Sequence, residues 1–238
     1  PTNHMEGHIL SPFLNTEQKI VFPALALLIS GGHTELVLFS EWGKYQVIGQ
    51  TRDDAVGEAY DKVARMLSLP YPGGPEISRL AEKARTLGSD TSIIKLPRPM
   101  IHSDNFDFSF SGLKTAVLYA IKKIPKLTEE IRRDIAREFE DSVTEVLISK
   151  TKKAIDEFGV ETLIIGGGVT ANTHIRKSFE LLASRLRTIK VLISEKELST
   201  DNAVMIAMAG YMNILLKNPT KQGLDVIQAK GHLKLDNK

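Results

Sequence analysis

The amino-acid sequence predicts an α/β fold in which helices pack on a mixed β-sheet. Early in the chain, three short β-prone segments follow one another and are separated by turn residues, which is the pattern of an antiparallel meander. Later in the chain, two further β-prone segments alternate with amphipathic patterns of helical period. A meander followed by alternating strands and helices favours helices packed on a mixed sheet over a β-sandwich or a helix bundle.

The predicted strands are short and aliphatic. They cover residues 24–30, 35–40, 45–51, 162–165 and 190–194. The first two strands are joined by Gly31-Gly32, a pair that suits a tight hairpin turn. A second glycine turn, Gly166-Gly167-Gly168, follows the fourth strand and leads into a helix.

The predicted helices follow from apolar residues at helical spacing. They cover residues 57–69, 76–87, 113–121, 128–158, 170–187 and 202–216. The prolines and glycines of residues 70–75 predict a loop, and Gly159 is a natural stop for the longest helix.

Composition narrows the function only modestly. The chain has 238 residues, 42% of them hydrophobic and 25% charged, which is ordinary for a globular protein. The absence of cysteine excludes disulfides, thiolate metal sites and a cysteine nucleophile from this chain. A net charge of +2 neither requires nor excludes a nucleic-acid partner. The longest apolar run, near residues 22–29, is too short for a bilayer span, so we expect no membrane anchor. The absence of cysteine fits a reducing compartment, so we expect a cytoplasmic protein.

The strongest candidate for a metal site is a pair of histidines near the start. His4 and His8 are four residues apart, so on a helix they share one face and can bind one ion. Asp201 is the candidate for a completing carboxylate, although its place before a helix is equally that of an N-cap. Glu6 is badly placed to be the general base of a zinc peptidase, because it does not directly follow the first histidine. A pair of surface histidines is the alternative to a metal site.

The two glycine turns are candidates for nucleotide binding. Consecutive amides in Ser30-Gly31-Gly32 can face an anion, although the same residues also make an ordinary hairpin. Asn172 follows the second turn and is placed to bind a ligand above it. Asp61 can present a carboxylate to ribose hydroxyls, or it is a solvated helix residue. No nucleophile elbow is present, so direct transfer is favoured over an acyl-enzyme.

Taken together, these motifs resemble the TsaD family in their order along the chain. The matching segments run from His4 to about Ala209, and the Phe-Ser-Phe-Ser-Gly-Leu-Lys-Thr form is similar to the bacterial and mitochondrial branch. The segments that carry the resemblance are Asn3-His4-Met5-Glu6-Gly7-His8, Leu28-Ile29-Ser30-Gly31-Gly32-His33-Thr34, residues 53–62, Tyr71-Pro72-Gly73-Gly74-Pro75, residues 108–115, Gly166 to Asn172 and Thr200-Asp201-Asn202.

The resemblance implies an actin and Hsp70-like ATPase fold, of which this chain would hold the second subdomain and the end of the first. Residues 1–22 would end the first subdomain and carry the metal motif. Residues 23–216 would form the second subdomain with the nucleotide loops, and residues 217–238 a C-terminal tail. The family has a further phosphate loop on an earlier strand. We therefore expect this chain to be a piece of a longer protein. The piece would lack the N-terminal part and would bind metal and nucleotide poorly by itself.

The resemblance also implies an activity and a set of site residues. The family transfers threonylcarbamoyl from threonylcarbamoyl-AMP to N6 of the adenosine next to the anticodon in tRNAs that read codons starting with A. It implies one divalent metal, iron before zinc, at His4, His8 and Asp201. The residues implied as contacts to the adenylate, with ATP as a further nucleotide, are Leu27, Leu28, Ile29, Ser30, Gly31, Asp61, Gly74 and Asn172.

The partners implied by the resemblance are tRNA, a TsaB-like paralogue and a TsaE-like ATPase. Two other functions compete with the transferase. One is a metal-dependent glycoprotein endopeptidase, which is an older label of the family. The other is a non-catalytic paralogue that serves as a partner subunit, and the presence of His4, His8 and Asp201 argues against it.

Overall fold

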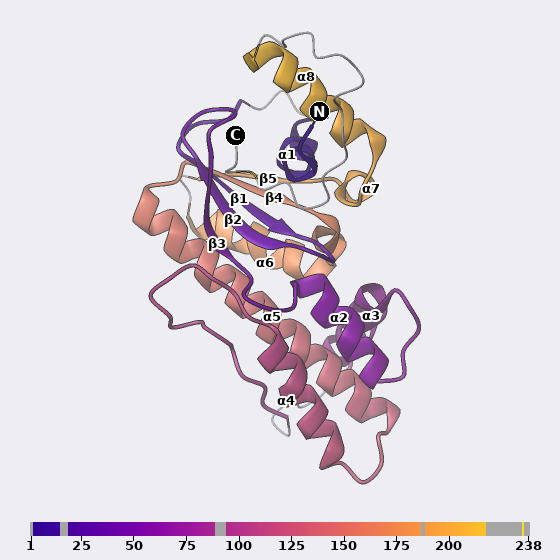
Figure 1. Cartoon of the computed structure of the whole chain (residues 1–238). Helices are drawn as coiled ribbons and strands as arrows, with labels where there is room; N and C mark the ends of the chain where they lie inside the picture. The colour runs from indigo at the N-terminus through magenta and orange to yellow at the C-terminus, as the bar shows by residue number, and fades with distance from the viewer. Residues whose placement is uncertain (1, 15–18, 89–93, 187–188, 218–234, 236–238) are drawn as a thin grey trace.

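The structure of the chain is a computed structural model (Figure 1), and it describes residues 2–14, 19–88, 94–186, 189–217 and 235. Nearly all of the predicted tail lies outside these residues. The elements in chain order are α1 (His4–Leu10), the 3-10 turn η1 (Ser11–Phe13), β1 (Ala24–Ile29), β2 (Thr34–Phe39), β3 (Tyr45–Gln50), α2 (Val56–Met66), α3 (Gly73–Thr86), α4 (Ser111–Lys122), α5 (Glu129–Phe158), β4 (Thr162–Gly166), the 3-10 turn η3 (Gly168–Ala171), α6 (Thr173–Arg185), β5 (Lys190–Ile193), α7 (Lys196–Ser199) and α8 (Ala203–Lys217).

The five strands form one mixed sheet, as the sequence predicts. Their order is β3-β2-β1-β4-β5, with β1 at the centre. The strands β1, β2 and β3 pair antiparallel, whereas β4 pairs parallel with both β1 and β5. The carboxyl ends of β1, β4 and β5 therefore meet at one edge of the sheet.

The central strand β1 is buried on both faces and explains how the two layers of helices are held. Successive side chains of a strand point to opposite faces. Leu25, Leu27 and Ile29 belong to one core with residues of α2, α3, α4, α5 and α6, while Ala24 and Leu28 face a second core with α1. Helix α8 packs on α1 rather than on the larger core (Figure 1).

The longest helix, α5, has the ends that the sequence predicts. The hydroxyl oxygen of Thr128 accepts a hydrogen bond from the amide of Ile131 and caps the first turn. Gly159 follows the last turn at φ 60°, a left-handed conformation that favours glycine. Between them α5 spans the molecule beneath the sheet, so its residues contact several of the elements around the candidate site (Figure 1).

Two helix starts each lie three residues from the predicted position, and α2 ends at Met66 rather than at residue 69. Residues Gly73 to Pro75 were expected in a loop, but they form the first turn of α3. The first N–H groups of a helix have no partner within it, so a proline there loses no hydrogen bond. The helix expected from residue 170 starts at Thr173 instead, after a 3-10 turn, because the side chain of Asn172 accepts from the amide of Ile175 and caps it.

The candidate metal and nucleotide site

The candidate site lies at the edge of the sheet where the parallel strands end. The chain leaves β1 toward β2 on one side and leaves β4 toward β5 on the other. Connections that diverge in this way open a crevice at the carboxyl ends of the strands, and α/β proteins bind their ligands there. Both predicted glycine turns and Asp201 follow strands that end at this edge.

Helix α1 places the two histidines on one face, as their spacing predicts. The side chain of Asn3 caps the helix, and its Oδ1 accepts from the amide of Met5 at 2.9 Å. The Nε2 atoms of His4 and His8 each lie 3.2 Å from Oδ1 of Asp201. One potential ligand atom from each of the three residues lies within 4.8 Å of the others, which is a compact set for one metal ion.

His8 has the surroundings that a metal ligand requires. Its side chain is 1% exposed. Among the residues that the structure describes, neither of its ring nitrogens makes a well-aligned hydrogen bond, and Nε2 lies 3.2 Å from Oδ1 of Asp201. Burial, followed by the nearby His4, lowers the pKa of His8 below its usual range. The neutral imidazole, which is the form that binds metal, is therefore favoured.

Asp201 is not the cap of α8, although its position allowed that interpretation. The side chain of Asn202 accepts from the amide of Met205 at 2.9 Å and occupies the capping position. The side chain of Asp201 is 76% exposed and lies beside the two imidazoles. Two imidazoles with one carboxylate leave coordination positions open for water or substrate, as is typical of catalytic zinc and of iron.

Glu6 faces away from the histidines. It is 1% exposed, and its carboxylate accepts from Nδ2 of Asn213 at 3.1 Å. Burial of the Tyr45 hydroxyl, and then its contact with Glu6, raises the pKa of Tyr45 above its usual range. Glu6 therefore joins α1 to its neighbours on the side away from the histidines.

The second glycine turn connects the histidine pair to the central strand. A Cβ on Gly166 would lie 2.5 Å from the carbonyl oxygen of His8, and one on Gly167 would lie 2.4 Å from that of Ile29. Gly167 also has φ 95° and ψ 159°, a conformation that only glycine adopts readily. Glycine at these positions allows α1, β1 and β4 to approach one another closely.

The first glycine turn is a compact hairpin in which the amides of Gly32 and His33 are already used. Oγ of Ser30 accepts from the amides of Gly32 and His33 at 3.3 and 3.0 Å. The side chains of Leu27, Leu28 and Ile29 are fully buried. Of the predicted adenylate contacts on this segment, only Ser30 and Gly31 reach the surface.

Asp61 and Gly74 lie at the start of α3. Oδ1 of Asp61 accepts from the amide of Gly73 at 2.8 Å and so caps the helix from outside. A Cβ built on Gly74 meets no atom of the described residues within 4 Å, so Gly74 offers open backbone at a helix N-terminus. Gly57 at the start of α2 packs on the carbonyl of Ser30, which brings α2, and with it Asp61, toward the first glycine turn.

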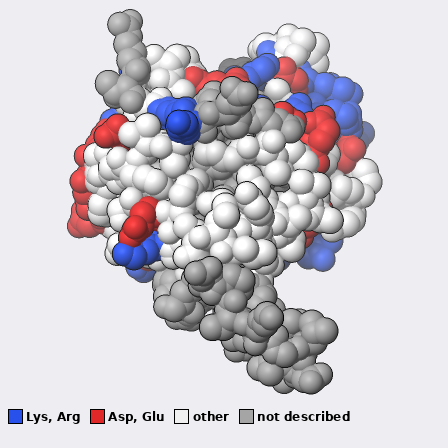
Figure 2. All heavy atoms as spheres, turned by 90° about the horizontal axis from the view of Figure 1, so that it is seen from above, with Lys and Arg blue, Asp and Glu red and all other residues white. Residues whose placement is uncertain are grey.

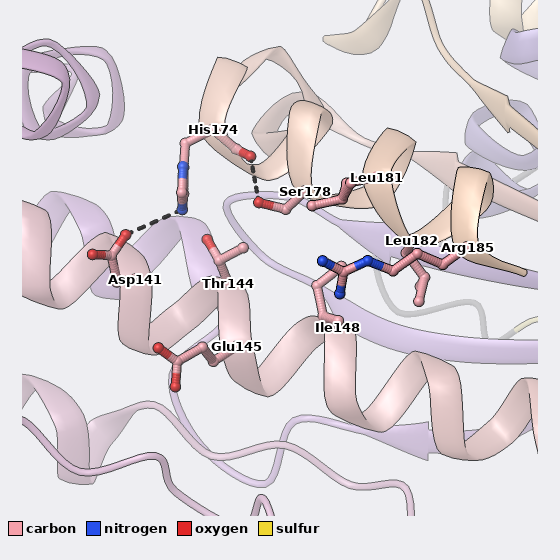
Figure 3. Close-up of a pocket in the computed structure, with 9 residues that line it drawn as sticks. All are labelled: Asp141, Thr144, Glu145, Ile148, His174, Ser178, Leu181, Leu182 and Arg185. Atoms are coloured by element: carbon pink, nitrogen blue, oxygen red, sulfur yellow. Dashed lines mark hydrogen bonds and ion pairs between the residues drawn. The ribbon is translucent and has the colours of Figure 1, made fainter. Parts of the chain in front are cut away.

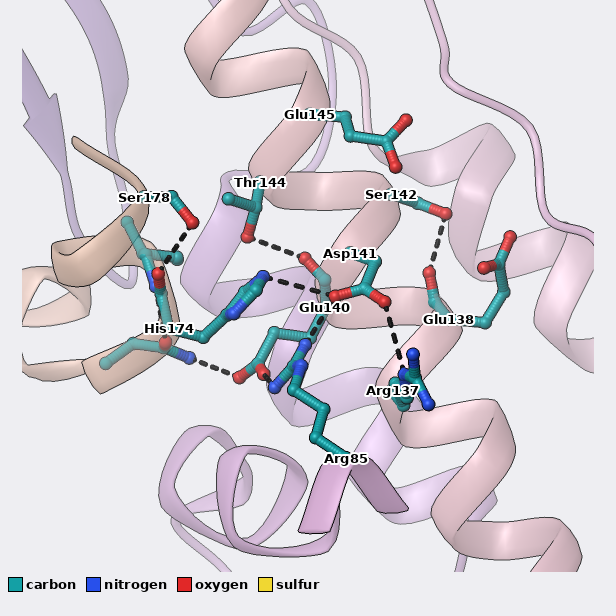
Figure 4. Close-up of polar contacts among 12 residues, drawn as sticks. Arg85, Arg137, Glu138, Glu140, Asp141, Ser142, Thr144, Glu145, His174 and Ser178 are labelled. Carbon is teal, nitrogen blue, oxygen red and sulfur yellow. Dashed lines mark hydrogen bonds and ion pairs between the residues drawn. The ribbon is translucent and has the colours of Figure 1, made fainter. Parts of the chain in front are cut away.

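The prediction missed the residues beneath Asn172. Its Nδ2 donates to Oε1 of Glu140 at 2.6 Å. Nη1 of Arg85 donates to the other carboxylate oxygen of Glu140 (Figure 4). Glu140 lies one turn before Val143 on the apolar stripe of α5. A charged residue in that stripe is a signal in the sequence, although it does not identify the partner.

A separate cavity of about 310 Å³ lies between α5 and α6 and contains none of the predicted site residues (Figure 3). Nε2 of His174 pairs there with Asp141 at 3.1 Å. Its lining residues are Asp141, Thr144, Glu145, Ile148, His174, Ser178, Leu181, Leu182 and Arg185.

The surface viewed from above is mostly uncharged, and both basic and acidic residues lie toward its margins (Figure 2). This mixed pattern does not by itself point to nucleic acid. Within the described part of the chain, no helix is both long enough and apolar enough to cross a bilayer.

Comparison with known proteins identifies the family to which this chain is similar. The family model TsaD, described as tRNA N6-adenosine threonylcarbamoyltransferase, matches residues 1–208. A protein with that name from Herminiimonas arsenicoxydans is 48% identical over 218 residues, which are 91% of this chain and 61% of the relative. One from Chromobacterium violaceum is 47% identical over 223 residues, which are 92% of this chain and 63% of the relative.

The chain thus spans about three fifths of the length of these relatives. Among solved structures, T. kodakarensis HypF matches 68% of this chain and 20% of its own, with a TM-score of 0.50 and 19% identity. That likeness concerns the fold alone.

Proposed function

The chain belongs to the TsaD family, and from that membership we propose that it carries the metal and adenylate sites of a tRNA N6-adenosine threonylcarbamoyltransferase. The reaction moves threonylcarbamoyl from threonylcarbamoyl-AMP to N6 of the adenosine adjacent to the anticodon in tRNAs that read codons beginning with A. AMP is the leaving group. Because the chain spans about three fifths of its relatives, the activity belongs to the longer protein.

One observation carries the proposal: in the described part of the chain, a buried imidazole lies beside a second imidazole and a carboxylate, within reach of one ion. His8 is the buried member, and His4 and Asp201 complete the set. This set lies next to the second glycine turn, since Gly166 is packed against the carbonyl of His8. A metal held there would be close to a nucleotide bound over that turn.

The chemistry fits a direct transfer. A divalent metal would supply Lewis-acid polarisation of the carbamoyl carbonyl or the phosphate. Two imidazoles and one carboxylate suit both iron and zinc, and we favour iron from the family resemblance. His4, His8 and Asp201 would hold it, one per subunit. The open backbone at Gly74 and the exposed Gly31 would bind the adenylate, and Asp61 would meet its ribose. Holding both substrates together supplies a large part of the rate enhancement.

The proposal extends to partners. We expect tRNA as acceptor, a TsaB-like paralogue and a TsaE-like ATPase as assisting proteins, ATP as a further nucleotide, and the cytoplasm as the location. Residues 1–22 would belong to the first of two actin-like subdomains and residues 23–216 to the second. The orientation of Glu6 toward Asn213 gives the endopeptidase alternative no support, because Glu6 is the only carboxylate between the two histidines in sequence.

The test is transfer of labelled threonine into tRNA by the full-length protein with its partner proteins, with and without chelator. We expect incorporation that chelator abolishes and that Asp201→Ala removes. Glu197→Ala is the matched control, since it deletes an exposed carboxylate from α7 nearby and should leave incorporation unchanged. Incorporation that survives both chelator and Asp201→Ala would overturn the metal assignment, and no incorporation by the unmodified protein would overturn the reaction.

A further inference from the structure

Glu140 is a fully buried acid in the middle of α5 whose carboxylate is held from two sides (Figure 4). Arg85, in the last turn of α3, donates from Nη1 to Oε2 at 2.6 Å. Asn172, the cap of α6, donates from Nδ2 to Oε1 at 2.6 Å. A buried carboxylate is tolerated only when its oxygens are satisfied, so this contact ties three helices to one another.

The contact fixes the orientation of the Asn172 side chain. Its Oδ1 accepts from the amide of Ile175 at 3.0 Å, while its Nδ2 donates to Glu140. Oxygen and nitrogen of a carboxamide have opposite hydrogen-bonding roles, so flipping the group would break both bonds. The second N–H of Nδ2 donates to the hydroxyl of Tyr60 at 3.5 Å, so one lone pair of Oδ1 remains for a ligand above the turn.

Arg85 is itself held, which prevents Glu140 from turning away. Its Nη2 donates to Oδ1 of Asp141, the next residue along α5. Asp141 is also paired with His174 at 3.1 Å and with Nε of Arg137 at 3.6 Å. The guanidinium thus bridges two neighbouring carboxylates in a planar geometry that suits arginine.

The same cluster touches α2 one residue before a predicted ribose contact. The hydroxyl of Tyr60 lies 3.5 Å from Nδ2 of Asn172, and Tyr60 is followed by Asp61. Tyr60 is buried and packs edge-on against Phe139 of α5. The elements that carry Asp61, Gly74 and Asn172 therefore meet at Glu140, although the three residues are far apart in the sequence.

We propose that Glu140, held by Arg85, is a positioning residue that fixes the carboxamide of Asn172, and with it the second glycine turn, for adenylate binding. The inference rests on the proposed function in one respect, namely that Asn172 faces the adenylate. Glu140 is fully buried beneath Asn172, so its action on the ligand passes through Asn172.

The test is Glu140→Gln in the full-length protein, read by AMP binding in calorimetry and by the KM for threonylcarbamoyl-AMP. Glutamine keeps the shape but removes the charge, and its amide group must present a donor to Arg85 or to Asn172. We expect the Kd of AMP and the KM to rise about tenfold, the worth of one charged hydrogen bond, with kcat and metal content little changed. Glu145→Gln is the control, because it makes the same change on the same helix at a side chain that is 54% exposed.

A double-mutant cycle distinguishes positioning from a general loss of structure. Asn172→Ser keeps a side chain that can cap α6, but it removes the amide group that donates to Glu140. If Glu140 acts through Asn172, Glu140→Gln should add no further rise in Kd in the Asn172→Ser protein. Additive effects, or an unchanged Kd with Glu140→Gln alone, would overturn the inference.

Two further outcomes are informative. Should Glu140→Gln fail to fold, Arg85→Lys keeps the charge without the bridging geometry, and its Kd for AMP should rise in the same direction; an unchanged Kd would overturn the inference. A protein that binds AMP in a Glu140-dependent way but transfers no threonine would support the inference and refute the proposed reaction. Transfer of threonine with an unchanged KM in Glu140→Gln would support the proposed reaction and overturn the inference.

Discussion

Replacing Gly167 by alanine should be among the most damaging single changes to this chain. The added Cβ would lie 2.4 Å from the carbonyl oxygen of Ile29 and 2.8 Å from its carbonyl carbon. Both atoms are backbone of the central strand, which is paired on both sides and has no room to move. The residue also has φ 95°, so the substitution is strained before any contact is counted.

Substitutions at two other glycines separate the two contributions to this loss of stability, which are backbone strain and steric collision. Gly159 has φ 60° but open space around it, so Gly159→Ala measures backbone strain alone and should cost about 1–2 kcal/mol. Gly168 has ordinary φ, and its nearest neighbour is 3.7 Å from the built Cβ. Gly168→Ala should therefore be neutral or stabilise by about 0.4–1 kcal/mol. Gly167→Ala combines strain with collision and should cost about 3–5 kcal/mol.

The assay is denaturant unfolding of the four proteins, with metal content measured in parallel. Gly167→Ala should also weaken metal binding, because the turn packs beside His8. If Gly167→Ala costs no more than Gly159→Ala, the contact with Ile29 does not have the rigidity assigned to it, and the account of the glycine turn is wrong.

The remaining predictions concern four single side chains. In chelator, Asn202→Ala should lower the free energy of unfolding by about 1 kcal/mol, because it removes the cap of α8. In the same chelator buffer Asp201→Ala should change it by less than about 0.5 kcal/mol, and equal losses of stability would contradict this division of roles. Without chelator, Asp201→Ala should abolish metal binding and Asn202→Ala should keep it. Because the folded pKa of His8 is lowered, the unfolded chain binds a proton first as pH falls below about 6.5. Unfolding free energy of the metal-free protein should therefore fall from about pH 7.5 to about pH 5.5, and His8→Leu should lose much of that dependence. Asp53 accepts from the amides of Phe110 and Ser111 at the start of α4, so Asp53→Ala should cost about 1 kcal/mol in the same unfolding assay, and no cost would show that these bonds are unimportant.

Local pattern was enough for much of the fold. The meander, the long helix α5 and its stop at Gly159 follow from apolar periodicity and from glycine conformation, which depend on neighbours in sequence. The start of α3 was missed because glycine and proline in a first turn resemble a loop. Asn202 took the capping role considered for Asp201, a difference of one residue that periodicity does not resolve.

The sequence by itself determined the mixed fold, the family resemblance and the candidate ligands, because each depends on the spacing of residues along the chain or on the order of the motifs. Only the tertiary structure decided that Asp201 meets His4 and His8, since this contact closes a separation of nearly the whole described chain. The same holds for Glu140 beneath Asn172. A charged residue on an apolar stripe indicates a buried polar partner. Which residue is that partner depends on how the helices pack, and packing is fixed by the folded chain as a whole.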